Sequence, residues 1–136
     1  MKKAVIVVGS HLVGKSRTIR EHVKPRLGIG TDSHIFARNG QAGFVLSQSF
    51  EEANRDIAGT VSRYSHYELL VLSARPAHED QSCLAELTAE LEIAGYVVST
   101  VEITAHLDDA YYDEKANEVV GYLDANQVSL EFAASP

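Results

Sequence analysis

Short apolar runs alternate along the chain with longer stretches in which apolar residues recur every three or four positions. The runs have the length and composition of buried strands in a parallel sheet. They predict strands at residues 4–8, 68–73 and 96–103. The recurring stretches are typical of helices with one buried face. They predict helices at residues 16–24, 50–64, 79–94 and after residue 108. Strands that alternate with helices pair in parallel through right-handed crossovers, so we expect an α/β fold of three layers, with helices on both faces of a mainly parallel sheet.

The segment between the first two helices predicts a short hairpin. Residues 33–37 and 43–46 have strand character, and Asn39-Gly40 between them is a favoured turn pair. We expect one further short strand near the end of the chain, at residues 128–132.

Local signals predict where the helices begin and end. Ser49 and Glu52 have the spacing of a capping box, which favours a helix that begins at residue 50. We expect the first helix to stop before Pro25, because a residue that precedes proline disfavours the helical conformation. Gly95 is expected to end the third helix, since glycine tolerates the left-handed conformation found there.

The first predicted strand runs into a loop with the spacing G-x-x-x-x-G-K-S, and the first predicted helix follows it. The loop consists of Gly9, Ser10, His11, Leu12, Val13, Gly14, Lys15 and Ser16. It resembles the P-loop, or Walker A motif, of nucleoside triphosphatases and kinases. Its glycines let the backbone turn tightly and approach a phosphate closely, and the N–H groups of residues 11–16 would point toward that anion.

The resemblance implies a fold of the P-loop NTPase type and a site for a nucleoside triphosphate with Mg²⁺. Lys15 would reach the β- and γ-phosphates, and the Ser16 hydroxyl would ligate Mg²⁺. His11 within the loop and Arg17 directly after it would lie beside the nucleotide. The chain has no N-K-x-D segment, which would have suggested guanine, so ATP is the expected nucleotide.

Turnover of a nucleotide also needs a carboxylate near the metal and a group that orients the nucleophile. In many P-loop relatives that carboxylate ends a buried strand, but here the run at 69–72 is followed by Ser73, with no acidic residue before Glu79. Asp32 is the alternative, because the Thr-Asp-Ser-His segment around it is similar to small-metabolite P-loop kinases such as gluconate and shikimate kinases. By that similarity Asp32 would contact substrate or metal-bound water; as a turn or cap residue it would have neither role.

Arginine side chains are the candidates for neutralising charge in the transition state. Arg75 follows a predicted strand and would reach the γ-phosphate, or else would form a surface ion pair. Arg17 and Arg38 are similar candidates.

Composition narrows the class of protein further. The 136 residues, 45% of them apolar, fit one domain over residues 1–136 with a real core. Acidic and basic residues balance over 1–101, so the net charge of −7 lies in 102–136, and without a basic patch we expect no nucleic-acid partner. The apolar run near the N-terminus is too short to span a membrane. The lone Cys83 has no partners at metal-ligand spacing and suits a reducing cytoplasm.

Three hypotheses about function follow from the sequence. In the first, the chain binds Mg²⁺ and ATP and uses them in hydrolysis or in phosphoryl transfer to a small-molecule or protein acceptor. In the second, it is a regulatory module that binds the nucleotide without efficient turnover, because the carboxylate at the strand end is missing. In the third, it retains only a phosphate or sulfate site and serves as an assembly partner. The oligomeric state is not indicated.

Overall fold

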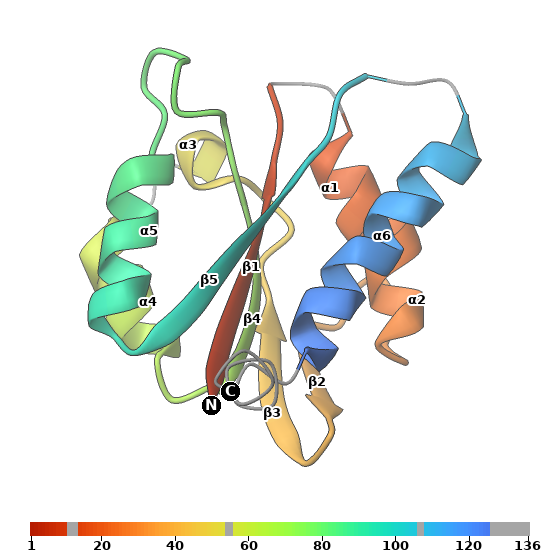
Figure 1. Cartoon of the computed structure of the whole chain (residues 1–136), viewed down its shortest axis with the longest axis horizontal. Coiled ribbons are helices and arrows are strands. Elements are labelled where there is room, and N and C mark those ends of the chain that lie inside the picture. The colour runs from red at the N-terminus through yellow and green to blue at the C-terminus, as the bar shows by residue number, and fades with distance from the viewer. Residues whose placement is uncertain (11–13, 54–55, 106–107, 126–136) are drawn as a thin grey trace, which may run out of the picture.

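The computed structural model describes residues 1–10, 14–53, 56–105 and 108–125, apart from the side chain of Glu52. Its centre is a five-stranded sheet with the strand order β2-β3-β4-β1-β5 (Figure 1). The strands are β1 (Lys2–Val8), β2 (Ile35–Arg38), β3 (Gln41–Val45), β4 (Leu69–Ala74) and β5 (Tyr96–Glu102). All neighbouring pairs are parallel except β2 with β3, which form the expected hairpin. The α/β class and the mainly parallel sheet are therefore confirmed.

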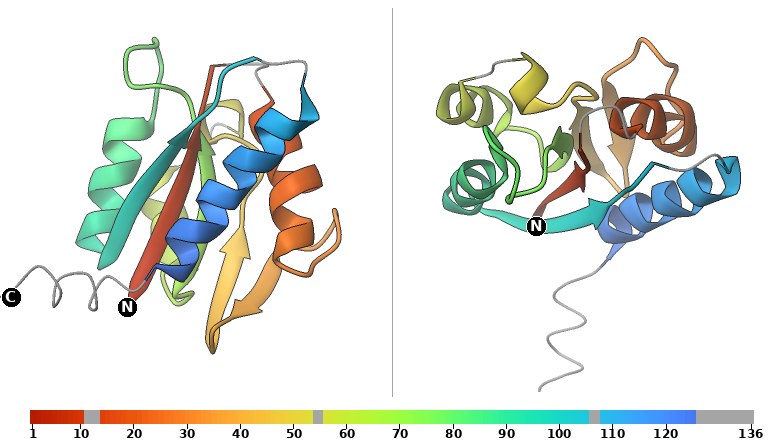
Figure 2. Two further views of the ribbon diagram at one scale, coloured as in Figure 1. Left: turned by 45° about the vertical axis from the view of Figure 1, so that its right-hand side comes forward. Right: turned by 90° about the horizontal axis from the view of Figure 1, so that it is seen from above.

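The described helical segments lie on both faces of the sheet, as Figure 2 shows most clearly from above. They are α1 (Lys15–Arg17), the π-helical segment η1 (Thr18–Val23), α2 (Lys24–Arg26), α3 (Phe50–Ala53), α4 (Ile57–Tyr64), α5 (Leu84–Ile93) and α6 (Asp109–Asp124). The first three segments and α6 cover one face, and α3, α4 and α5 cover the other. None of the helices in the described ranges is long and apolar enough to cross a membrane.

Alternate residues of β1 supply the two halves of the core. Val5 and Val7 pack in a cluster with η1 and α6, whereas Ala4, Ile6 and Val8 pack in a cluster with α4 and α5. Because side chains of a strand alternate between the two faces of the sheet, a continuous apolar run is what a strand covered on both sides requires. Residues 4–8 of the strand that leads into the glycine loop are therefore buried, as is the whole of the neighbouring strand β4.

Three helix boundaries differ from those predicted. The first helix does not stop before Pro25 but continues to Arg26. In η1 the hydrogen bonds span one residue more than in an α-helix, and the Lys24 N–H donates to the carbonyl oxygen of Ile19. Pro25 therefore stands in the first turn of α2, where a missing N–H is tolerated.

The other two differences concern residues 50–94. The helix expected over 50–64 is described as α3 and α4, on either side of residues 54–55, which lie outside the described part of the chain. The helix expected from residue 79 begins only at Leu84, because the preceding segment is held as a loop. Both the Arg75 N–H and the Cys83 N–H donate to the carboxylate of Glu51, at 3.0 and 2.6 Å. The strand expected at 128–132 also lies outside the described residues.

Candidate functional site

The Gly9–Ser16 loop leaves the carboxyl end of β1, as the sequence predicts, and runs into α1. The Gly9 N–H donates to the carbonyl oxygen of Ala74 at 3.2 Å, which ties the start of the loop to the end of β4. Gly14, at the other end, has a φ of 99°, in the left-handed region that favours glycine. A Cβ at Gly14 would lie 3.3 Å from the ring of Tyr112 in α6. Residues 11–13, with the candidates His11, Leu12 and Val13, lie outside the described residues.

The side chain of Lys15 reaches back to the start of this loop. This side chain is buried, and its Nζ donates hydrogen bonds to the carbonyl oxygens of Gly9 at 2.6 Å and Ser10 at 2.9 Å. The ammonium group therefore lies against the start of the loop, where it contacts two carbonyl oxygens. An anionic oxygen would be a stronger acceptor than either carbonyl.

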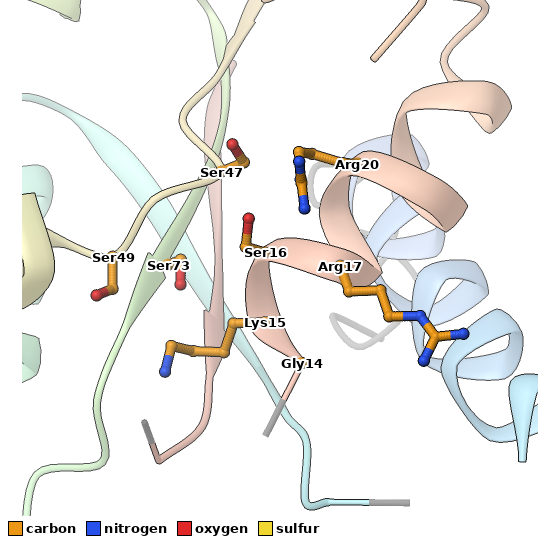
Figure 3. A pocket seen from close by; sticks show the side chains of 8 residues that line it. All are labelled: Gly14, Lys15, Ser16, Arg17, Arg20, Ser47, Ser49 and Ser73. Atoms are coloured by element: carbon orange, nitrogen blue, oxygen red, sulfur yellow. The ribbon is translucent and has the colours of Figure 1, made fainter. Parts of the chain in front are cut away.

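A cavity of about 300 Å³ opens beside Lys15 (Figure 3). The described residues that line it are Gly14, Lys15, Ser16, Arg17, Arg20, Ser47, Ser49 and Ser73. They come from the start of the first helix, from the segment after β3 and from the end of β4. This part of the lining contains three cationic side chains and four hydroxyls but no carboxylate, which is the chemistry of an anion-binding site.

Ser73 occupies the strand end where the resemblance to P-loop proteins would place a carboxylate. It pairs with Val7 of β1, is fully buried, and its Oγ has no hydrogen-bond partner among the described residues. Mg²⁺ prefers carboxylates and phosphate oxygens and keeps several of its waters. The described lining therefore fits Mg²⁺ only as an ion held mainly by phosphate oxygens and water, with the Ser16 hydroxyl as a protein ligand. No group of three or more metal-binding side chains occurs in the described part of the chain.

The two arginines of the cavity differ in their partners. Arg17 donates to Glu21 at 2.7 Å and to Asp109 at 2.8 Å, so its guanidinium is directed toward α6 (Figure 3). Arg20 makes no hydrogen bond or ion pair with the described residues, and its side chain extends from η1 toward Ser16 and Ser47. Of these two arginines, only Arg20 offers the cavity an uncompensated charge.

The other candidate arginines lie outside the described lining. Arg38 forms a two-point ion pair with Asp124, and its pKa is raised by that hydrogen bond. The buried side-chain Nε of Arg75 has no hydrogen-bond partner among the described residues. Its backbone N–H donates to the carboxylate of Glu51.

Asp32 also lies outside the lining of the cavity. It is exposed and belongs to the loop that precedes the edge strand β2. Its charge acts instead on Lys24, a buried lysine whose Nζ donates to the carbonyl oxygen of Thr31 at 2.7 Å. Burial lowers the pKa of Lys24, and Arg20 lowers it further, while Asp32 raises it. The structure therefore does not bring Asp32 together with Ser16 among the residues that line the cavity.

Sequence reasoning missed three residues of this region. Ser47 and Ser49 follow β3, and the tendency of ligands to bind at the carboxyl ends of strands in such sheets is the signal that would have found them. Arg20 lies on the exposed side of the first helix and carries no sequence signal. The same tendency predicts that residues 73–80 lie near the loop, and there the Glu79 carboxylate accepts a hydrogen bond from the Ser10 hydroxyl.

A second cavity, of about 490 Å³, lies at the start of the Gly9–Ser16 loop, between the ends of β4 and β5. Its wall combines apolar side chains with a few polar ones. The described residues that line it are Val8, Gly9, Ser10, Pro76, Ala77, His78, Leu84, Glu102, Ile103 and Thr104.

Comparison with protein-family models, with curated proteins and with solved structures gave no match.

Proposed function

We propose that this chain binds a nucleoside triphosphate, ATP, together with Mg²⁺ through the Gly9–Ser16 loop, and transfers the γ-phosphoryl group to a small acceptor. The observation that carries the proposal is the position of Lys15, whose ammonium group lies on the carbonyl oxygens of Gly9 and Ser10 beside an open, carboxylate-free lining. Phosphate oxygens are charged and therefore stronger acceptors than these carbonyl oxygens, so a bound phosphate would compete with them for the Lys15 ammonium group.

Most of the described groups of the cavity have a role in the proposal. Lys15 neutralises charge on the β- and γ-phosphates, and the first N–H groups of the helix, which lack acceptors within it, bind phosphate oxygens. The Ser16 hydroxyl would be a ligand of Mg²⁺, and Mg²⁺ would neutralise further charge on the phosphates. The space bordered by Arg20, Ser47 and Ser49 accommodates the acceptor.

Ser73 favours a second candidate function. A serine at the strand end leaves the described cavity without the carboxylate that turnover usually requires. In this second candidate the chain is a regulatory module, which binds the nucleotide tightly and turns it over negligibly.

The test is calorimetric titration with ATP and with a non-hydrolysable analogue, with and without Mg²⁺, followed by a phosphate-release assay on the same samples. We expect Lys15→Ala to weaken binding of both nucleotides by about 10- to 100-fold, because hydrogen bonds to charged groups contribute about 1.5–3 kcal/mol. The control variant Lys115→Ala removes a lysine that pairs with Glu118 on α6 and should bind as the native chain does.

The outcomes separate the hypotheses. Lysine-dependent binding with little release fits a kinase that awaits its acceptor or a regulatory module, and transfer to added acceptors separates these two. Rapid release without any acceptor indicates hydrolysis in place of transfer. No binding at millimolar nucleotide, or equal binding by the native chain and Lys15→Ala, would contradict the proposal.

A further inference from the structure

We propose that Arg20, Ser47 and Ser73 form a second oxyanion site in this cavity, next to the one at Lys15, and that it holds a negatively charged group of a small molecule. The assignment of that molecule as the phosphoryl acceptor rests on the function proposed above. The binding of an oxyanion by these three residues does not depend on it.

The first observation is the burial of Ser73 and the lack of a hydrogen-bond partner for its hydroxyl among the described residues. Ser73 lies at the end of β4 and lines the cavity. Buried hydroxyls are nearly always hydrogen-bonded in native proteins, so one without a partner needs a reason. A ligand oxygen in the adjoining cavity would supply the missing bond.

The second observation is the charge of Arg20. The guanidinium has no carboxylate partner in the described part of the chain, whereas Arg17, one helical turn away, is bound by Glu21 and Asp109. A guanidinium presents several N–H donors in a planar fork that matches phosphate and carboxylate oxygens. Arg20 is exposed, so an anion that enters the cavity can reach its guanidinium.

The third observation is the arrangement of these groups. Lys15 lies on one side of Ser16 with its amine on the loop carbonyls, and Arg20 lies on the other side beside Ser47 (Figure 3). The cavity thus has two cationic positions with hydroxyls between them. At the end of β4 the neutral Ser73 replaces the carboxylate expected from the P-loop resemblance, and that carboxylate would repel a second anion. The chemical class that fits is a small molecule with a phosphate or carboxylate group.

An oxyanion in this place has two sources, the γ-phosphate of the nucleotide itself or a separate molecule. The experiment separates them by titrating inorganic phosphate into the chain with and without a saturating non-hydrolysable ATP analogue and Mg²⁺. The variants are Arg20→Gln, Ser73→Ala and Lys15→Ala, and thermal melting followed by circular dichroism checks that each is folded. Arg63→Gln is the matched control, because Arg63 is an exposed arginine on α4, on the opposite face of the sheet.

We expect phosphate to bind in the presence of the analogue, roughly tenfold more weakly in Arg20→Gln, since a charge-assisted hydrogen bond is lost. Binding should also weaken by about tenfold in Ser73→Ala, which loses one hydrogen bond to the charged phosphate, and stay within about twofold of native in Arg63→Gln. Lys15→Ala should lose the analogue and keep the Arg20-dependent phosphate site. If the native chain binds no nucleotide but binds phosphate, and Arg20→Gln weakens that binding, the proposed function fails and this inference stands.

Two results would overturn the inference. One is one-for-one competition between phosphate and the analogue, which would make Arg20 part of the γ-phosphate site alone. The other is equal phosphate binding by the native chain and Arg20→Gln.

Discussion

The hydroxyl of Ser10 donates a hydrogen bond to the carboxylate of Glu79 and so joins the Gly9–Ser16 loop to the segment after β4. This contact places a negative charge beside the loop that we propose binds phosphate. We expect Glu79→Gln to raise the affinity for a non-hydrolysable ATP analogue by about threefold to tenfold, because two like charges near a protein surface repel by about 1 kcal/mol or more at short range. Calorimetry measures the change.

The neighbouring Asp80 provides the control for Glu79. It is exposed and forms no hydrogen bond with the described residues, so Asp80→Asn removes the same charge without touching Ser10. Its effect on affinity should be clearly smaller. A lower affinity in Glu79→Gln than in the native chain would show that this carboxylate supports the nucleotide site.

Much of the fold is predictable because its signals are local. The run at 4–8 is apolar at every position, which only a strand covered on both faces requires, and Asn39 and Gly40 take the left-handed φ values of 54° and 77° that their turn needs. The start of α5 is not predictable in this way. It depends on the Glu51 carboxylate, more than thirty positions from Cys83 in the chain, which binds the N–H of that residue.

In the candidate site, too, some residues are predictable from local sequence and others depend on distant parts of the chain. Lys15 and Ser16 are adjacent in sequence, so one motif predicts that they share a cavity. Ser47 and Ser73 line the same cavity only because β3 and β4 are parallel neighbours, which depends on the strand order. Asp32 precedes β2, which stands three strands from β1, or roughly 14 Å at about 4.8 Å per strand. No spacing in the sequence reveals that separation.

Among the glycines of the site, Gly14 is the one whose replacement should lower the free energy of unfolding most. Its φ of 99° is strained for any other residue, and a Cβ would press on the Tyr112 ring at 3.3 Å. We expect Gly14→Ala to lower the free energy of unfolding by about 1–3 kcal/mol, measured by urea denaturation. Gly121 in α6 has nothing within 4 Å of the corresponding position. Gly121→Ala should therefore raise the same free energy by about 0.5–1 kcal/mol; equal losses in both variants would refute this account of Gly14.

The ion pair between Arg38 and Asp124 links the hairpin to the end of α6. Its two contacts are 2.6 and 2.9 Å long. The hydrogen bond from Arg38 lowers the pKa of Asp124, so this pair stabilises the fold above the usual aspartate pKa of about 4 and stops doing so as the pH falls through the lowered value. We expect Arg38→Gln to reduce the free energy of unfolding by up to about 1 kcal/mol at pH 7, since both side chains are partly exposed.

The difference between Arg38→Gln and the native chain should shrink as the pH falls below about 4, where this aspartate takes up a proton in the unfolded chain, and should be lost below the lowered pKa at which Asp124 takes up a proton in the folded chain. Urea denaturation at a series of pH values measures it. Arg63→Gln removes the same charge from a residue that forms no ion pair with the described residues and should show no such trend. A constant difference across the series would mean that Arg38 acts through packing and not through charge.

Tyr96, at the start of β5, makes the fold sensitive to alkali. Its ring is buried, and its hydroxyl lies 2.5 Å from the carbonyl oxygen of Tyr67 and 3.3 Å from that of Tyr64. Burial raises the pKa of Tyr96 to about 12. In the unfolded chain a tyrosine releases its proton near pH 10, so the contribution of Tyr96 is complete below pH 10 and is lost as the pH rises toward 12.

We expect Tyr96→Phe to lower the free energy of unfolding by about 1 kcal/mol at pH 7, because partly buried carbonyl oxygens lose their donor. Above pH 10 the native chain should lose stability more steeply than the variant, so the two denaturation curves converge. Tyr122, which is 41% exposed on α6, gives the control Tyr122→Phe, and its stability should follow the native chain at every pH. Parallel alkaline losses in the native chain and in Tyr96→Phe would show that some other group causes them.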